Sequence, residues 1–260
     1  MNKMNIAVIA VVLYLMLSSA ANAQTDTTYW KRGAKGTLTF TQVSLTNWSA
    51  GGENSVSLNA YINTFANYAK GRNTWKNNLE LGYGLVNQGD QGVRKSDDKI
   101  IFTTKYGYRL KKDNAHILWS TLLDFKTQFD IGYEFSEDGT RTKISDFMAP
   151  GYLTIATGLE YEPSEYFNLL YAPITGKITF VSSDILANRE GGAYGVKQGD
   201  NRLSELGSFL KLSFKKDIAK NVNLESKLEL FTAYDENFGN IDINWQNALL
   251  MKVNSWLSAN

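Results

Sequence analysis

Polar and apolar residues alternate along ten segments of the chain, each long enough to form a β-strand. The alternation is clearest in 55–68, 117–131, 222–234 and 241–255, and weaker in 36–45, 75–86, 99–110, 152–161, 166–180 and 204–215. A period of two that is sustained over this length indicates strands rather than helices, because successive side chains of a strand point to opposite faces. The pattern predicts an all-β protein.

The connections between these segments alternate between short and mostly long. The short ones are 70–73, 111–114, 162–165 and 216–221, and the others are 46–54, 87–98, 132–150, 181–202 and 235–240. Bacterial outer-membrane barrels have short periplasmic turns and longer outer loops. The segments also reach the about 9–11 residues that a tilted strand needs to cross a bilayer. We therefore predict an antiparallel up-and-down transmembrane β-barrel, with a water-soluble β-sandwich as the alternative.

Two details of the segments refine this prediction. Aromatic residues gather near segment ends, as expected for interfacial girdles: Trp75, Tyr106, Tyr108, Trp119, Tyr161, Tyr166, Phe231, Tyr234, Trp245 and Trp256. Near Pro173 the apolar face changes parity, from Phe167, Leu169 and Tyr171 to Ile174, Ile178 and Phe180. Because proline cannot donate to a strand ladder, we expect a bulge or a register break there.

The N-terminus has the features of a secretory signal peptide. A lysine at position 3 precedes an apolar run at 6–17, and Ala21-Asn22-Ala23 matches a signal-peptidase site. We predict a signal peptide at 1–23, an N-terminal periplasmic segment at 24–35 and a barrel at 36–260; the alternative is a retained membrane anchor. The expected location is the bacterial outer membrane.

Composition narrows the chemistry. The chain has no cysteine, which excludes disulfides, thiol nucleophiles and zinc–thiolate sites. Its 27 Lys+Arg against 26 Asp+Glu lack the basic excess of a nucleic-acid binder. The single histidine, His116, is too far along its strand from Ser120 for a Ser-His pair, and acidic loop segments match no calcium motif. We therefore expect no enzyme activity, no cofactor and no metal.

The polar faces of the strands carry charges of both signs. We predict a network inside the barrel that contains Asp124, Lys126, Asp130, Glu225, Lys227 and Glu229. Buried charges persist when they are paired, and a small barrel has little room beyond its own side chains. The mixed signs therefore favour an interior closed by ion pairs; a selective pore is the alternative.

Two stretches of the sequence are distinctive. One is 38–55, which contains Asn47-Trp48-Ser49-Ala50-Gly51-Gly52-Glu53-Asn54, and the other is 233–245, which contains Asp235-Glu236-Asn237. Together they resemble an exported barrel family of unknown function that is typical of Bacteroidota. The resemblance implies an outer-membrane barrel without an assigned activity. It also implies one more hairpin after Asn260, so we expect about 12 strands in the intact protein; the alternative is a complete barrel of about 10.

Two functional classes fit these expectations. The first is a structural or accessory subunit, or an interaction platform, of an outer-membrane complex, with Trp48, Trp245 and Trp256 as candidate partner contacts. The second is a transport barrel that passes a small solute or a lipid. The expected partners are outer-membrane lipid, including lipopolysaccharide, and other outer-membrane proteins.

Overall fold

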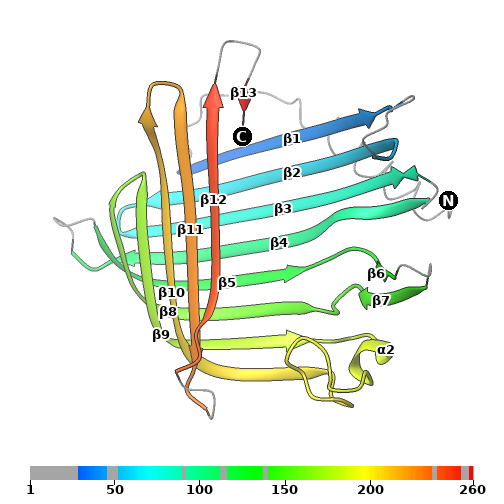
Figure 1. The fold of residues 1–260 in the computed structure, drawn as a ribbon. Helices are drawn as coiled ribbons and strands as arrows, with labels where there is room; N and C mark the ends of the chain where they lie inside the picture. Colours follow the sequence, from blue (N-terminus) through cyan, green and yellow to red (C-terminus); the bar gives the residue numbers. More distant parts are fainter. Residues whose placement is uncertain are drawn as a thin grey trace.

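The computed structural model describes residues 29–45, 52–89, 92–111, 116–136, 140–235, 239–252 and 258–259. Its main feature is one antiparallel sheet of eleven strands (Figure 1). These are β1 (Trp30–Val43), β2 (Ser55–Lys70), β3 (Asn73–Gln88), β4 (Val93–Arg109), β5 (Ile117–Thr127), β8 (Gly151–Ser164), β9 (Phe167–Phe180), β10 (Arg202–Ala219), β11 (Val222–Ala233), β12 (Asp242–Lys252) and the short β13 (Ser258–Ala259). The predicted signal peptide, Trp48 and Trp256 lie outside the described residues.

The predicted all-β antiparallel fold is confirmed, and each of the ten predicted segments overlaps one long strand. The N-terminal boundary was wrong. β1 begins at Trp30 rather than at residue 36, so residues 30–35 belong to the sheet and not to a separate segment. Gly33 and Gly36 weaken the alternation there, and the strand is fixed instead by its continuous pairing with β2, from Trp30 opposite Tyr68 to Val43 opposite Ser55.

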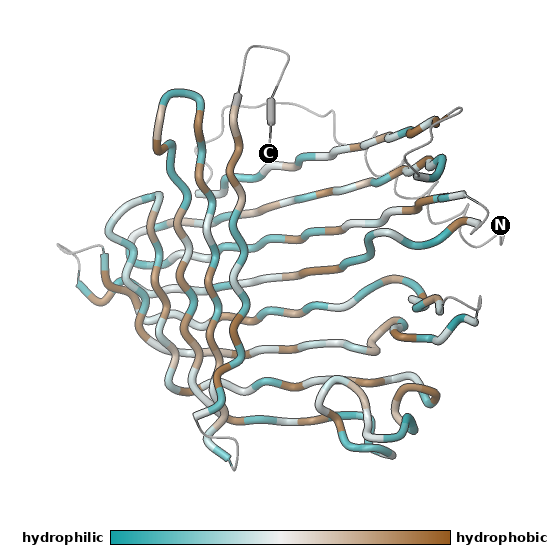
Figure 2. The backbone as a smooth tube through the Cα atoms, viewed as in Figure 1, coloured by the Kyte–Doolittle hydropathy of each residue, from teal (hydrophilic) through white to brown (hydrophobic). Residues whose placement is uncertain are grey.

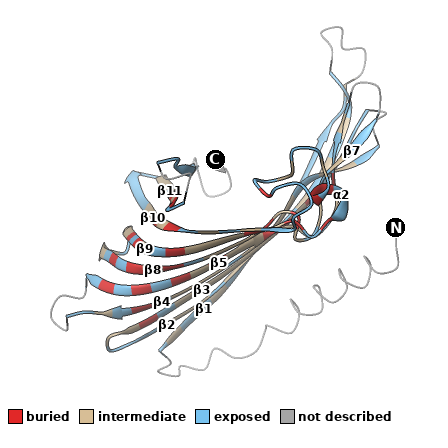
Figure 3. Cartoon of the chain, turned by 90° about the horizontal axis from the view of Figure 1, so that it is seen from below, coloured by how far each residue is buried: buried red, intermediate tan, exposed pale blue. Residues whose placement is uncertain are grey.

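Each strand of the main sheet pairs with the next one in the chain, apart from an excursion between β5 and β8. The sheet is strongly curled, so that β11 and β12 pass across β1–β5 in Figure 1, and β10 and β11 lie at the opposite end of the curl from β1 in Figure 3. We call the concave, inner side of this curl the trough. In the part of the chain that the structure describes, β1 and β13 are the two edges, and no pairing joins them.

The predicted irregularity at Pro173 is confirmed as a bulge in β9. Gly207 pairs with Thr175 whereas Phe209 pairs with Ala172, so one residue of β10 faces two of β9. The pairing with β8 shifts at the same place. The extra residue shifts the alternation by one position, which explains the change of the apolar face. Proline, which has no backbone N–H to donate, is tolerated at such a break in the ladder.

The two faces of the sheet have opposite chemistry, and Figure 2 shows the alternation along each strand. On the outer face of β5, Ile117 and Trp119 are 40% and 44% exposed. On its inner face, Leu118, Ser120 and Asp124 are buried. Figure 3 shows that buried residues concentrate on the central strands β5, β8 and β9. The sheet therefore exposes its apolar face and covers its polar face.

A small apolar cluster also lies on the inner face. It consists of Leu122, Ala156, Leu170, Ala172, Phe209, Phe231 and Ala233. The prediction that Phe231 belongs to an interfacial girdle was wrong. Phe231 has the parity of the inner face, where it is buried and packs under the ammonium of Lys177, with Nζ 4.8 Å from the ring centre.

The two ends of the sheet differ in their connections. At the short-turn end, the connections are 71–72, 110–116, 165–166 and 220–221; at the long-loop end they are 44–54, 89–92, 128–150, 181–201 and 234–241. The long loops contain a hairpin of β6 (Gly132–Phe135) and β7 (Arg141–Ser145), and the one-turn helix α2 (Asp184–Ala187). Sequence periodicity did not predict these three elements. None of the described helices is long and apolar enough to cross a membrane.

The long loops have a core of their own, beyond the end of the sheet (Figure 3). Its buried residues are Ala149, Val181, Leu186, Ala187 and Val196. Arg189 Nη2 donates to the Lys143 carbonyl at 2.6 Å, and the Tyr194 hydroxyl donates to the Ile144 carbonyl. Burial raises the pKa of the Tyr194 phenol above its ordinary value. The two longest loops therefore pack together as one cap.

Candidate functional site

Ion pairs span the inner face of the curled sheet. Lys126 Nζ on β5 lies 2.9 Å from both Asp124 Oδ2 and Glu229 Oε2, and Glu229 on β11 also pairs with Lys211 Nζ at 2.7 Å. β5 and β11 are separated in the sheet by β8, β9 and β10. The Lys126–Glu229 pair therefore crosses the concave side of the sheet and joins two strands that share no ladder, whereas Lys211 is the register partner of Glu229 on the neighbouring β10.

A second cluster surrounds Glu160, whose carboxylate is 1% exposed. It pairs with the ammonium of Lys105 and accepts hydrogen bonds from the Ser120 hydroxyl and the Asn168 amide. Nearby, Lys76 Nζ is 2.5 Å from Glu162 Oε1. A buried carboxylate is stable when its charge is compensated and its lone pairs are used, and Glu160 meets both conditions.

The predicted charge network is only partly assembled. Asp124, Lys126 and Glu229 lie together, whereas Glu225 pairs separately with Lys215 near the short-turn end. Asp130 lies beyond β5 in the long-loop region, where one carboxylate oxygen accepts from the Tyr83 hydroxyl at 3.3 Å. Lys227 is exposed, and no ion pair of it occurs among the described residues. The alternation of the sequence predicts which face of the sheet these residues share. It does not predict how far along the strands each one lies from the others.

Three further residues are central to these clusters: Lys105, Glu160 and Lys211. Each has the inner-face parity of its strand, so the sequence contained the signal for their orientation. It contained no signal for their pairing. Lys105 and Glu160 come from β4 and β8, and they meet because β5 between them presents the small Ser120.

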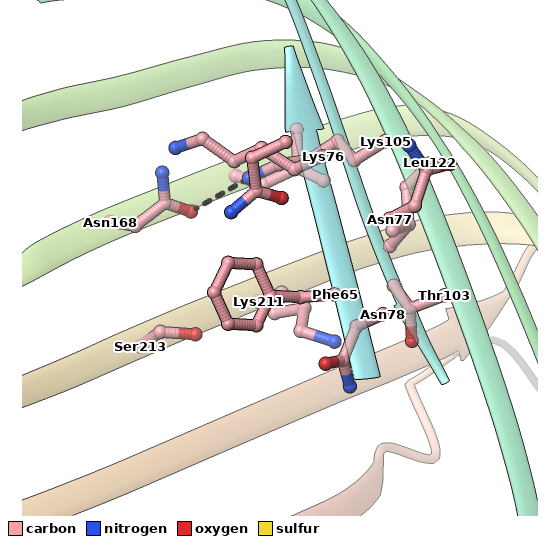
Figure 4. A pocket seen from close by; sticks show the side chains of 12 residues that line it. Phe65, Lys76, Asn77, Asn78, Thr103, Lys105, Leu122, Asn168, Lys211 and Ser213 are labelled. Atoms are coloured by element: carbon pink, nitrogen blue, oxygen red, sulfur yellow. Dashed lines mark hydrogen bonds between the residues drawn. The ribbon is translucent and has the colours of Figure 1, made fainter. Parts of the chain in front are cut away.

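A cavity of about 350 Å³ lies against this inner face (Figure 4). It is lined by Phe65, Asn67, Lys76, Asn77, Asn78, Thr103, Lys105, Leu122, Asn168, Leu170, Lys211 and Ser213. Its three lysines are each paired with a glutamate, as described above. The lining therefore offers amide, hydroxyl and apolar groups, and its positive charge is already compensated.

Among the described residues, the two candidate catalytic groups from the sequence, His116 and Ser120, are not brought together. His116 lies in the short-turn end, is exposed, and its Nδ1 is 3.2 Å from the Glu162 carbonyl. Ser120 is fully buried and donates to Glu160, not to a histidine. Across the described ranges, no group of three or more His, Asp or Glu side chains could hold a metal ion. Asp97-Asp98 is one of the acidic segments that match no calcium motif, and Asp98 pairs with Lys95 at 2.7 Å.

Of the three tryptophans predicted to contact a partner, only Trp245 is described. It lies on the outer face of β12 and is 66% exposed, and its Nε1 donates to Ser226 Oγ at 3.1 Å. This position agrees with an outward-facing role, and the partner stays a prediction. Trp48 and Trp256 lie outside the described residues.

Comparison with known proteins gives one finding. A family model described as a protein of unknown function (DUF3078) matches residues 40–133, from the end of β1 into β6. No curated protein and no solved structure matches the chain significantly. The match agrees with the resemblance to a family of unknown function. The outer-membrane location and the source in Bacteroidota stay predictions.

Proposed function

We propose that this protein is an integral outer-membrane β-barrel whose interior is closed by ion pairs, and that it acts as a structural or accessory subunit of a membrane complex. One observation carries the proposal. The sheet exposes apolar side chains such as Ile155 and Leu159 on its outer face, while it buries Asp124 and Glu160 on its inner face. In water, this distribution is the reverse of the favourable one.

This distribution is favourable when hydrocarbon, and not water, surrounds the outer face. Water-soluble monomers rarely expose contiguous apolar patches larger than a few hundred Å². Membrane barrels, in contrast, alternate apolar-out and polar-in along every strand. Closed barrels also satisfy every backbone group without water, so the proposal requires that the edge of β1 be paired in the membrane.

The closed interior favours a subunit over an open channel. Lys126 and Glu229 connect opposite walls of the trough, and Lys105 and Glu160 fill a second part of it. A barrel of this size has little space left once such side chains fill it. The exposed aromatic residues of the outer face, Trp245 among them, are available to pack against another membrane protein.

Purification in mild detergent from native membranes tests this proposal. We expect the protein in the outer-membrane fraction with stoichiometric partners, identified by mass spectrometry. In planar bilayers, we expect single-channel conductance far below that of an open porin. Recovery in the aqueous fraction would contradict the membrane assignment, and porin-like conductance would contradict the closed interior.

The cavity favours a second candidate, a transport barrel for a small uncharged polar solute. Its amides, Asn67, Asn78 and Asn168, and the ring of Phe65 are groups that hold hydroxyl-rich molecules, and its lysines are neutralised. Liposome swelling distinguishes the two candidates. Swelling in isotonic sugars at a rate above that of empty liposomes supports transport, and no difference in rate supports the subunit.

A further inference from the structure

Four cations at the short-turn end lie over aromatic rings. Arg32 lies 5.5 Å from the ring centre of Trp30, Lys70 lies 4.5 Å from Tyr29, Arg72 lies 4.6 Å from Tyr108, and Lys216 lies 4.4 Å from Tyr166. We call Arg32, Lys70, Arg72 and Lys216 the basic collar. They come from β1, β2, β10 and the turn after β2, so the collar extends around the curl of the sheet.

Two of the rings beneath the collar, Trp30 and Tyr108, belong to an aromatic row on the outer face of β1–β5. In the strand register, Trp30 is opposite Tyr68, Tyr68 is opposite Trp75, and Trp75 is opposite Tyr106. Tyr108, two residues after Tyr106 on β4, is opposite Trp119. Rings with an apolar body and a polar edge prefer the headgroup level of a bilayer, so this row marks one interface.

Charge is distributed unevenly between the two ends. At the short-turn end, Lys111 and Lys220 add further exposed basic side chains. Among the described residues, the acidic side chains near this end are Glu162, which pairs with Lys76, Glu225, which pairs with Lys215, and the exposed Glu165 and Asp217. At the long-loop end, ion pairs such as Lys95–Asp98 and Lys143–Asp146 join bases to acids, and exposed acids such as Glu190 and Asp200 accompany the exposed bases. The uncompensated positive charge therefore lies beside the aromatic row.

We propose that the basic collar binds the headgroups of anionic phospholipids in the leaflet that contacts the short-turn end. This inference rests on the proposed membrane location and adds a lipid preference to it. The aromatic row fixes the depth of the interface, and the collar places cations at that depth. A phosphodiester accepts hydrogen bonds from guanidinium and ammonium groups, and a net negative headgroup gains from each nearby cation.

Titration of lipid into the full chain in detergent, followed by native mass spectrometry, tests the inference. The lipids are dioleoyl-phosphatidylglycerol and dioleoyl-phosphatidylcholine, which share their acyl chains and differ in charge. The test variant carries Arg32→Gln, Lys70→Gln and Lys216→Gln. Arg72 is left intact because its guanidinium also donates to the carbonyls of Arg109 and Leu110.

The matched control carries Arg141→Gln, Lys197→Gln and Arg202→Gln. These three exposed bases lie at the long-loop end, and Arg141 also lies over a ring, 5.2 Å from the centre of Tyr133. The change in net charge is the same in both variants. Circular dichroism checks that each variant has kept its strands. If the triple variant unfolds, the single substitutions Lys216→Gln and Lys197→Gln are compared instead, each of which removes one charge.

We expect the collar variant to lose about fivefold in phosphatidylglycerol affinity per removed cation, and on the order of 100-fold in total. The control variant should bind like the wild type, and phosphatidylcholine binding should not change. Raising the salt from about 0.1 M to about 1 M should weaken phosphatidylglycerol binding by the wild type.

Three results would overturn the inference. The collar variant keeps wild-type affinity, the control variant loses as much, or inorganic phosphate competes with the lipid at equal concentration, which would mean a free anion is bound instead of a headgroup. None of these three results contradicts the proposed membrane location, provided that the wild-type protein is recovered in the detergent-soluble membrane fraction. Recovery of the wild type from the aqueous fraction defeats the membrane location and, with it, this inference.

Discussion

On the outer face of β8, Ile155 is 46% exposed, whereas Glu160 on the inner face of the same strand is 1% exposed. The same inversion recurs on β5, where Trp119 is exposed and the neighbouring Ser120 is buried. A water-soluble sheet places its apolar face inside and its charges outside. Under the proposed membrane location, the two faces of this sheet differ because one contacts hydrocarbon and the other lines the interior of the barrel.

The difference also changes how each face is stabilised. The inner face is held by directional contacts, such as Lys126–Glu229 and Lys105–Glu160, whose removal leaves a buried charge without a partner. The outer face makes few such contacts, and its stability depends on the solvent around it. Substitutions that move charge onto one face, or off the other, therefore test the comparison directly.

The largest effect is expected on the inner face, from Glu160→Gln. The substitution keeps the shape but leaves Lys105 buried without its counter-charge, so we expect a loss of about 3–5 kcal/mol in unfolding free energy. Urea titration in lipid vesicles measures it. Glu165→Gln, in the exposed turn after β8, is the control and should change stability by less than about 0.5 kcal/mol. Equal small effects at both positions would indicate a hydrated, open interior.

The next effect is expected on the outer face, from Ile155→Lys. A lysine at the depth of the bilayer centre costs about 2–4 kcal/mol. The same substitution at Ile185, which is 67% exposed on α2 beyond the sheet, should cost less than about 0.5 kcal/mol. The measurement is again urea unfolding in vesicles. If the two lysines have the same small effect, the outer face is in water.

A smaller effect is expected at the bulge that keeps the two faces in register. A Cβ at Gly158 would lie 2.1 Å from the Tyr171 carbonyl oxygen, whereas one at Gly176 would have nothing within 4 Å. Because the obstacle is backbone, Gly158→Ala should cost about 1–3 kcal/mol. Gly176→Ala should be neutral or slightly favourable for the strand. Melting temperatures of the two variants, compared in one detergent, show whether the order holds.

The smallest effect is expected from Lys227→Gln. Lys227 has the inner-face parity of β11 but is exposed. Its substitution should change the unfolding free energy by less than about 0.5 kcal/mol. Lys126→Gln, which leaves both Asp124 and Glu229 short of a partner, is the comparison and should be clearly more destabilising. A reversal of this order would mean that the inner charges do not act as the two clusters described.

Much of the sheet could be predicted from the sequence because a strand repeats every two residues. Alternation located ten long strands, and the parity change at Pro173 located the bulge. The same rule assigned Asp124, Lys126 and Glu229 to one face. The start of β1 was missed because glycines interrupt its pattern, and its position is determined by pairing with β2.

The contacts between distant strands depend on how the sheet curls, and the alternation of polar and apolar residues contains no information on the curl. Lys126 and Glu229 meet across the trough, 103 residues apart in the chain, and Glu160 gathers partners from β4, β5 and β9. The β6–β7 hairpin and α2 lie in loops whose short elements show no sustained period. Phe231 was misplaced because nearness to a strand end was weighed above parity.

The most direct measurement of the central claim uses the absence of native cysteine. Single cysteines placed in turn at positions 153–160 of β8 are spin-labelled in vesicles, and their collision rates with oxygen and with a water-soluble nickel chelate are compared. The account predicts that the outer positions, which include 155 and 159, are reached by oxygen and shielded from nickel, with a period of two. Nickel access at those outer positions equal to that at exposed Ile185 would contradict it.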